Sequence, residues 1–218
     1  MIEEKELHYF PVKILEYTDP GWTPEWCEEF KAWAREFPAN QSNFPEGVIT
    51  SKTDMHKDDA PCVQRVVKFF NECLEQYKQR FELNCDQLEI TLSWFNHAPS
   101  MSGWGHPLHR HPMSYVSSVY YITDGAPTIF GDPCTPRTSD TLDVWQDNLM
   151  KDDGWNLGIN EMYQSNPGKL IIFPSWLHHF SGRQLQDFDR WTISFNALPT
   201  GKVNTGPYGL PQVNLKLL

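Results

Sequence analysis

The sequence of 218 residues has little of what marks several protein classes. No apolar run approaches the roughly 20 residues that a membrane-spanning helix needs. The acidic start, residues 1–6, lacks the apolar stretch of a secretory signal peptide. Asp and Glu outnumber Lys and Arg by 28 to 18, and no basic run stands out. We therefore expect a cytoplasmic protein without a membrane partner, and a nucleic-acid partner is disfavoured because phosphate binding needs clustered Lys and Arg.

Cysteine is also scarce. The five cysteines are scattered, odd in number and form no Cys-x-x-Cys pair. Disulfide frameworks and structural zinc sites are marked by paired spacings, which are missing here. Reduced thiols in a cytosolic protein are therefore the expected state of these residues, which are Cys27, Cys62, Cys73, Cys85 and Cys134.

Aromatic residues are abundant, with nine Trp, and several of them lie in two helical patterns. Residues 22–37 repeat apolar side chains at three- and four-residue spacing, and Thr23 and Pro24 suit the start of a helix. Residues 60–81 show the same period, with Pro61 near the start. Both apolar stripes are expected to pack in the core of the protein.

After Asn84 the period of the apolar pattern changes from 3.6 to 2. Further strand candidates are residues 115–123, 169–174 and 191–198. Two helices followed by many short strands predict a mainly β fold, in which the helices cover one face of a closed or double-layered antiparallel sheet. The first strand has an expected buried face of Leu88, Ile90, Leu92 and Trp94.

We interpret the whole chain, residues 1–218, as one domain. It divides into a helical part of about residues 1–84, a β-barrel core of about 85–200 and a tail of 201–218. Residues 132–167 are polar and weakly patterned, which is typical of a functional lid or an insertion.

In the segment His106-Pro107-Leu108-His109-Arg110-His111-Pro112, His109 and His111 are two residues apart. In a strand, residues i and i+2 point to the same face, with Cα atoms roughly 6.5–7 Å apart. His109 and His111 could therefore approach one metal ion at about 2.0–2.2 Å. The alternative is a surface or hydrogen-bonded pair without a metal.

A second histidine pair, His178 and His179, follows the apolar residues 169–174 and a corner that contains Pro174. Imidazole beside buried aromatic side chains can bind iron away from bulk water. Two ordinary loop histidines are the alternative.

The segment from Arg190 to Asn196 alternates strictly between two faces. If its polar face points inward, Arg190 and Thr192 can hold a carboxylate by bidentate and single hydrogen bonds. A strand with a solvated polar face is the alternative. The apolar face comprises Trp191, Ile193 and Phe195, and the polar face comprises Arg190, Thr192, Ser194 and Asn196.

These segments, in this order, resemble a family of 2-oxoglutarate–Fe(II) oxygenases that is common in phages and marine bacteria. The resemblance covers roughly residues 88–198, apart from 132–167. Its most specific parts are Phe-Pro-Ser-Trp-Leu-x-His at 173–179 and Arg-x-Thr-x-Ser-Phe-Asn at 190–196. The resemblance implies a double-stranded β-helix, the jelly-roll fold of the related prolyl 4-hydroxylases.

The resemblance also implies a metal site. His109 and His111, on an early core strand, and His179, at the end of a later strand, would together bind one Fe(II). His178 is the neighbour of this ligand, but the spacing of the family favours His179.

The implied cosubstrates are 2-oxoglutarate and O₂. Arg190 would bind the distal carboxylate of 2-oxoglutarate, helped by Thr192. Tyr121 would donate to the same carboxylate, as the second Tyr of a Tyr-Tyr strand does in the related prolyl hydroxylases.

The ligand set departs from the usual pattern in this kind of enzyme. Most of these oxygenases use His-x-Asp or His-x-Glu, whereas His111 stands at that position here. A site of three neutral histidines is one charge unit more positive than a site of two histidines and one carboxylate. If a carboxylate does bind the metal, Asp132 is the best candidate for this alternative ligand. The literal His-x-Asp at residues 56–58 precedes every core strand, and we interpret it as a chance match in which Asp58 or Asp59 caps a helix.

The implied function is hydroxylation of an unidentified substrate, small-molecule or peptidyl, with release of succinate and CO₂. Two alternatives stay open. One is a three-histidine dioxygenase that does not use 2-oxoglutarate, and the other is a non-catalytic barrel such as a virion or binding protein. A carboxylate clamp at Arg190 and Thr192 favours the 2-oxoglutarate-dependent oxygenase over the three-histidine dioxygenase, since only the former needs such a clamp.

If residues 132–167 form a lid, their backbone amides should exchange rapidly with solvent in the apo-protein and more slowly once cosubstrate and substrate are both bound. Hydrogen exchange followed by mass spectrometry measures this directly. Exchange as slow as that of the core strands in the apo-protein would contradict the lid.

Overall fold

The computed structural model describes residues 12–40, 45–131, 160–204 and 213–217. Within these residues the chain forms two antiparallel sheets, two α-helices and one short 3-10 helix, in agreement with the predicted mainly β fold with supporting helices. None of the described helices is long and apolar enough to cross a membrane.

The larger sheet has seven strands, with β9 near its centre between β4 and β3. β10 also pairs with β9, close to the end of the chain. The remaining strands run in the order β1-β7-β4-β9-β3-β2. Their bounds are β1 Leu15–Thr18, β2 Ile49–Thr50, β3 Cys85–Ala98, β4 Val116–Tyr121, β7 Lys169–Pro174, β9 Arg190–Val203 and β10 Val213–Leu215.

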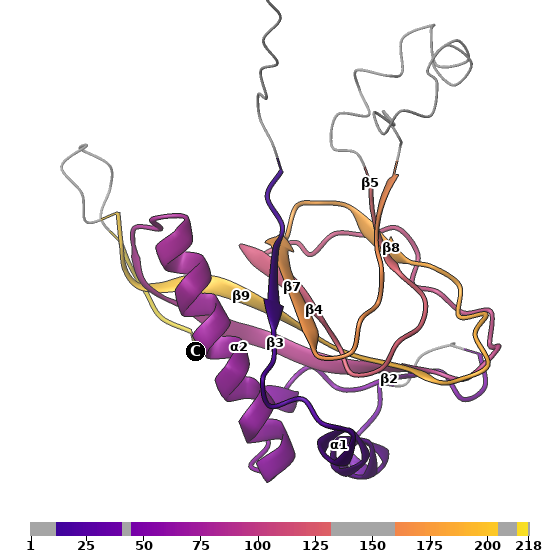
Figure 1. Cartoon of the computed structure of the whole chain (residues 1–218). Coiled ribbons are helices and arrows are strands. Elements are labelled where there is room, and N and C mark those ends of the chain that lie inside the picture. Colours follow the sequence, from indigo (N-terminus) through magenta and orange to yellow (C-terminus); the bar gives the residue numbers. More distant parts are fainter. Residues whose placement is uncertain (1–11, 41–44, 132–159, 205–212, 218) are drawn as a thin grey trace, which may run out of the picture.

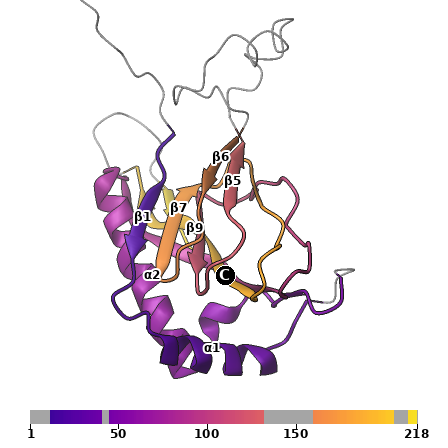
Figure 2. The ribbon, with the colours of Figure 1, turned by 45° about the vertical axis from the view of Figure 1, so that its right-hand side comes forward.

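The smaller sheet has three strands in the order β6-β5-β8, which are β6 Asn160–Tyr163, β5 Thr128–Gly131 and β8 His179–Ser181. Figure 1 shows β5 and β8 on one side of the larger sheet and α2 on the other. Figure 2, turned by 45°, shows β6 beside β5 and β1 beside β7, in agreement with the strand pairing. The molecule is therefore layered as helices, larger sheet and smaller sheet.

Both helices begin where the sequence predicts. α1 spans Pro24–Glu36, and the Thr23 side chain accepts a hydrogen bond from the Trp26 amide at 3.1 Å. α2 spans Pro61–Arg80. The prediction that Asp58 or Asp59 caps this helix is wrong, because Ala60 is the N-cap residue and no side chain caps the helix. The Asp58 carboxylate instead accepts from the Ala60 amide at 2.9 Å. It holds the residue that precedes the helix rather than the first turn itself.

Two expectations about element boundaries need correction. The part expected to be helical, residues 1–84, also contains β1, which pairs along the edge of the sheet with β7. The short strand β6 lies within residues 132–167, where the sequence shows no strand pattern, and it pairs with β5. Short edge strands carry too few alternating residues to be distinguished from loop by pattern alone.

The apolar core has two parts. The larger part fills the space between the helices and the larger sheet, and includes the apolar face of β9 predicted from the sequence, Trp191, Ile193 and Phe195. The smaller part lies on the opposite face of the larger sheet, toward the smaller sheet, and comprises Val119, Tyr121, Phe130, Ile171, Phe173 and Leu177.

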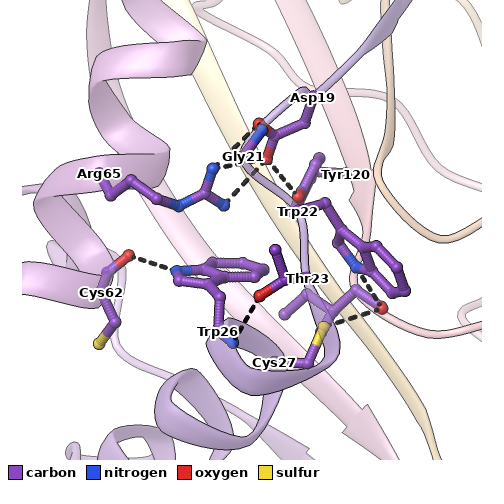
Figure 3. Close-up of polar contacts among 10 residues, drawn as sticks. Asp19, Gly21, Trp22, Thr23, Trp26, Cys27, Cys62, Arg65 and Tyr120 are labelled. Atoms are coloured by element: carbon purple, nitrogen blue, oxygen red, sulfur yellow. Dashed lines mark hydrogen bonds and ion pairs between the residues drawn. The ribbon is translucent and has the colours of Figure 1, made fainter.

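A partly buried ion pair, in which Asp19 is buried and the Arg65 side chain is 29% exposed, joins the helical layer to the larger sheet. The Asp19 carboxylate, just after β1, accepts hydrogen bonds from both terminal nitrogens of Arg65 on α2 at 2.9 Å (Figure 3). It also accepts from the Tyr120 hydroxyl on β4 at 2.6 Å and from the Gly21 amide at 2.8 Å. The Arg65 guanidinium lies 4.2 Å from the ring centroid of Trp26 on α1, so four segments meet at one charge pair.

We predict that Asp19→Ala lowers the free energy of unfolding by about 3 kcal/mol, because it leaves the Arg65 charge without its partner. Denaturant titration measures the change. Glu28→Ala is the control, since Glu28 is 69% exposed and its ion pair with Lys31 should contribute less than about 1 kcal/mol. Equal losses in the two variants would contradict a special role for the partly buried pair.

Candidate functional site

Three histidines converge in a cavity that is lined by strands of both sheets, β3 and β9 of the larger one and β5 and β8 of the smaller one. The ligand nitrogens of His109, His111 and His179 all lie within 4.8 Å of one another. His109 and His179 face each other in an isolated antiparallel bridge, where each amide donates to the other's carbonyl at 2.9 Å. His111 and His179 bring their Nε2 atoms to 3.2 Å. The structure therefore places together the three histidines that the sequence comparison selected.

The backbone around His109 and His111 differs from the expected core strand. These residues lie between β3 and β4. The bridge at His109 ties this segment to β8, and a bond from the His111 amide to the Ser175 carbonyl at 3.0 Å ties it to the turn between β7 and β8. Local pairing with two elements, rather than a continuous ladder, holds both imidazoles toward the same point.

Two of the imidazoles are oriented by backbone carbonyls. His109 Nδ1 lies 2.7 Å from the Pro107 oxygen, and His179 Nδ1 lies 3.0 Å from the Leu177 oxygen. A carbonyl can only accept, so each Nδ1 carries the proton and each Nε2 presents its lone pair. This is the arrangement that protein ligands of divalent metals adopt.

Burial favours the neutral form of His111 and His179. Burial, with a smaller contribution from the neighbouring imidazoles, lowers the pKa of His111 to about 3. Burial also lowers the pKa of His179 to about 4, although the hydrogen bond to the Leu177 carbonyl acts in the opposite direction. His106, on the same wall, has its pKa lowered to about 4 by burial and by the nearby Arg190. Neutral imidazole is the form that binds metal.

The polar face of β9 forms the wall beside the histidines. Arg190 is only 5% exposed, and its Nε donates to the Ala126 carbonyl at 2.9 Å. Burial lowers the pKa of Arg190. Among the described residues, no carboxylate forms an ion pair with it. The polar face therefore points inward and carries a buried cation toward the cavity. The cavity is lined by Trp94, Asn96, His106, His109, His111, Ser118, Val119, Thr128, His179, Phe180, Ser181, Arg190, Thr192 and Ser194.

This arrangement can bind a divalent metal and, next to it, an anion. Residues 92–196 match the family described as "Putative 2OG-Fe(II) oxygenase". The match indicates a 2-oxoglutarate- and Fe(II)-dependent oxygenase. A search of curated proteins by sequence found no match.

Solved structures similar to the oxygenase share its fold at low sequence identity. A prolyl-4-hydroxylase from Pseudomonas putida is 13% identical, with 87% of this chain and 94% of that chain covered and a TM-score of 0.58. HygX from Streptomyces hygroscopicus, with nickel and 2-oxoglutarate bound, is 12% identical over 87% of this chain and 84% of that chain, with a TM-score of 0.56. AviO1 from Streptomyces viridochromogenes Tue57 is 14% identical over 92% of each chain, with a TM-score of 0.57. These likenesses confirm the predicted double-stranded β-helix.

The remaining predicted site residues of the oxygenase lie in different places. Thr192 is buried and lines the cavity two residues after Arg190. Tyr121 is fully buried, but its hydroxyl donates to Thr128 Oγ1 at 2.6 Å, and Thr128 rather than Tyr121 lines the cavity. Burial raises the pKa of Tyr121 to about 12, so this hydroxyl remains a donor.

The competing ligand candidates do not join the three histidines in the described part of the oxygenase. Asp132 lies outside the described residues. His178 is exposed beside the buried His179. His56 lies in the short 3-10 helix η1, Met55–Lys57, where its Nδ1 is 2.9 Å from the Ser93 hydroxyl.

Trp94 and Asn96 of β3 also line the cavity, and the sequence pattern missed them. The expected buried face of this strand placed Trp94 with Leu88, Ile90 and Leu92. An irregularity in the pairing with β9 between Ile90 and Leu92 shifts the register. Leu92 is therefore 40% exposed, and beyond it Trp94 and Asn96 face the cavity. A bulge of this kind reverses the faces of a strand without any change in composition.

We predict that His179→Ala abolishes stoichiometric binding of Fe(II) or a surrogate divalent ion, because two imidazoles remain in place of three. Metal analysis after dialysis measures the stoichiometry. His178→Ala is the matched control and should keep the metal. Retention of one metal per chain in His179→Ala would exclude His179 as a ligand.

Proposed function

We propose that the oxygenase binds Fe(II) through His109, His111 and His179, and holds 2-oxoglutarate with Arg190 and Thr192. The observation that carries this proposal is the buried Arg190 guanidinium, which lines the same cavity as the histidines and has no acid partner among the described residues. A buried cation is costly unless it is paired. A dicarboxylate that reaches the metal at one end and Arg190 at the other would supply the missing charge.

The donor set fits the metal. Imidazole suits Fe(II), and two of the three histidines already present a lone pair at Nε2 because their Nδ1 atoms donate to carbonyls. Bound Fe(II), with 2-oxoglutarate and O₂, supplies the oxidant for hydroxylation of a C–H bond, with release of succinate and CO₂. The residues of the chain hold the metal ligands in place, pair the cosubstrate carboxylate with Arg190 and shield the cosubstrate from water.

Charge balance also favours a dianionic cosubstrate. Three neutral imidazoles do not compensate the two positive charges of a divalent ion, and the Arg190 guanidinium adds a third positive charge to the cavity. No carboxylate lines the described cavity, so nothing on its walls compensates these charges. 2-Oxoglutarate carries two negative charges and would neutralise most of them.

Tyr121 would take part through a neighbour. Its hydroxyl donates to Thr128, which lines the cavity, and thereby leaves the Thr128 hydroxyl proton free to turn toward a bound carboxylate. We therefore assign Thr128, supported by Tyr121, as a third contact for the distal carboxylate beside Arg190 and Thr192.

The setting of the enzyme follows from the sequence. We infer that residues 1–218 form one oxygenase domain that works in the cytoplasm of a bacterium or of a phage-infected host, on a small-molecule or peptidyl substrate. The resemblance to oxygenases common in phages and marine bacteria supports this bacterial or phage-infected setting. The acidic composition disfavours a nucleic-acid substrate.

We predict that Arg190→Ala stays folded, keeps its metal and loses 2-oxoglutarate affinity by at least about 30-fold. Loss of a charge-assisted bidentate contact costs about 2–5 kcal/mol, which is the source of that factor. Anaerobic titration of 2-oxoglutarate into the Fe(II)-loaded protein measures the affinity through the visible charge-transfer band of the complex. Arg183→Ala, which removes an exposed guanidinium from the neighbouring loop, should leave the affinity unchanged.

Two outcomes would separate the alternatives. Unchanged 2-oxoglutarate affinity in Arg190→Ala, or no binding by the parent, would favour a three-histidine dioxygenase that does not use this cosubstrate. Metal and 2-oxoglutarate binding without any succinate release under O₂ would favour a non-catalytic barrel.

A further inference from the structure

The third histidine of the site, His111, is oriented differently from the other two. His109 and His179 each donate from Nδ1 to a backbone carbonyl. His111 instead has its Nδ1 3.4 Å from Nδ2 of Asn196, a buried side chain on β9. A side-chain amide can present either its oxygen or its nitrogen, whereas a carbonyl can only accept.

The protons of the metal-free site can be placed from these contacts. His179 donates from Nδ1, so its Nε2 carries a lone pair. The Nε2 atom of His111 lies 3.2 Å from it, and this contact is a hydrogen bond only if His111 carries its proton on Nε2. Nδ1 of His111 must then accept, and the Asn196 amide nitrogen faces it. The proton of His111 therefore lies between two ligand atoms, where a metal would have to bind.

A chain of hydroxyls holds the other side of the Asn196 amide. Asn196 Oδ1 accepts from the Ser117 hydroxyl at 2.8 Å, and the Ser117 and Ser175 hydroxyl oxygens are also 2.8 Å apart. Both serines are buried. A hydroxyl can donate or accept according to its rotation, so this chain can reverse direction without any movement of the backbone.

We propose that Asn196 is the positioning residue of His111, and that its amide reverses when the site is loaded with metal. The inference rests on the proposed role of His111 as a metal ligand. For His111 to bind through Nε2, its proton must be on Nδ1 instead. Asn196 is then the acceptor, with Oδ1 toward His111 and Nδ2 toward Ser117, which changes from donor to acceptor. No proton is gained or lost by the imidazole, which only exchanges one neutral tautomer for the other.

The test compares Asn196→Asp and Asn196→Leu with the parent, all in the full chain. A carboxylate can only accept, so Asn196→Asp should place the proton on Nδ1 of His111 even without metal. Asn196→Leu removes the acceptor altogether and should weaken Zn(II) and Co(II) binding by about 10- to 100-fold, the usual effect of losing such a contact. Thr91→Val is the matched control, since the Thr91 hydroxyl donates to the backbone carbonyl of Asn196 at 3.2 Å and not to its side chain.

Two readouts are needed. Nitrogen-15 NMR of the histidine rings distinguishes the two tautomers. It should show His111 protonated on Nε2 in the metal-free parent and on Nδ1 in the Zn(II)-loaded parent and in metal-free Asn196→Asp. Competition titration with a chelator gives the metal affinities, in which Asn196→Asp and Thr91→Val should keep at least the affinity of the parent.

A merely structural role for Asn196 would leave the tautomer of His111 unchanged in Asn196→Asp, and that result would overturn the inference. So would parent-like metal affinity in a folded Asn196→Leu. If Asn196→Leu does not fold, the tautomer in Asn196→Asp still decides. Failure of the parent to bind Zn(II) or Co(II) would refute the proposed metal site instead, while the tautomer comparison between the metal-free proteins would still test the contact between Asn196 and His111.

Discussion

The structure depends on the burial of both faces of β9. This strand lies between β3 and β4 in the larger sheet, so its backbone groups are paired on both sides. One face packs its aromatic and branched side chains against the helices. The other face is polar and equally buried, from Arg190 to Asn196. Buried polar groups destabilise a protein unless each finds a partner, so this face constrains everything packed against it.

The partners of that polar face come from the strand next to it and from the loops above it. Ser118 exchanges hydrogen bonds with the backbone of Phe195, and Ser117 bonds the side chain of Asn196. Arg190 uses its Nε on the Ala126 carbonyl. The guanidinium of Arg190 and hydroxyl groups of the same face line one cavity together with three imidazoles. Free hydrogen-bonding groups of this kind, held on a rigid scaffold, allow a ligand to bind with little rearrangement.

The helices act at a distance from the cavity but support it. α1 and α2 cover the back of the larger sheet, and the Asp19–Arg65 pair joins them to β1 and β4. β4 carries Ser117 on the side of Asn196 and Tyr120 on the helical side. A shift of the helical layer would therefore be passed through β4 to the contacts that position Asn196 and the polar face of β9.

The sequence by itself determined the two helices, the central strands and the division of β9 into an apolar and a polar face, because these depend on periodicities that are visible over six residues or more. Its motifs also selected the three histidines and Arg190. The tertiary structure alone decided that the polar face points inward and that His109 and His111 approach the site from a loop rather than a strand. It also decided that an irregularity turns Trp94 and Asn96 toward the cavity, and that Thr128 and Asn196 contact the groups which the motifs had named. These features depend on which elements lie opposite one another, and a linear pattern of residues contains no information about the partner across a sheet or a cavity.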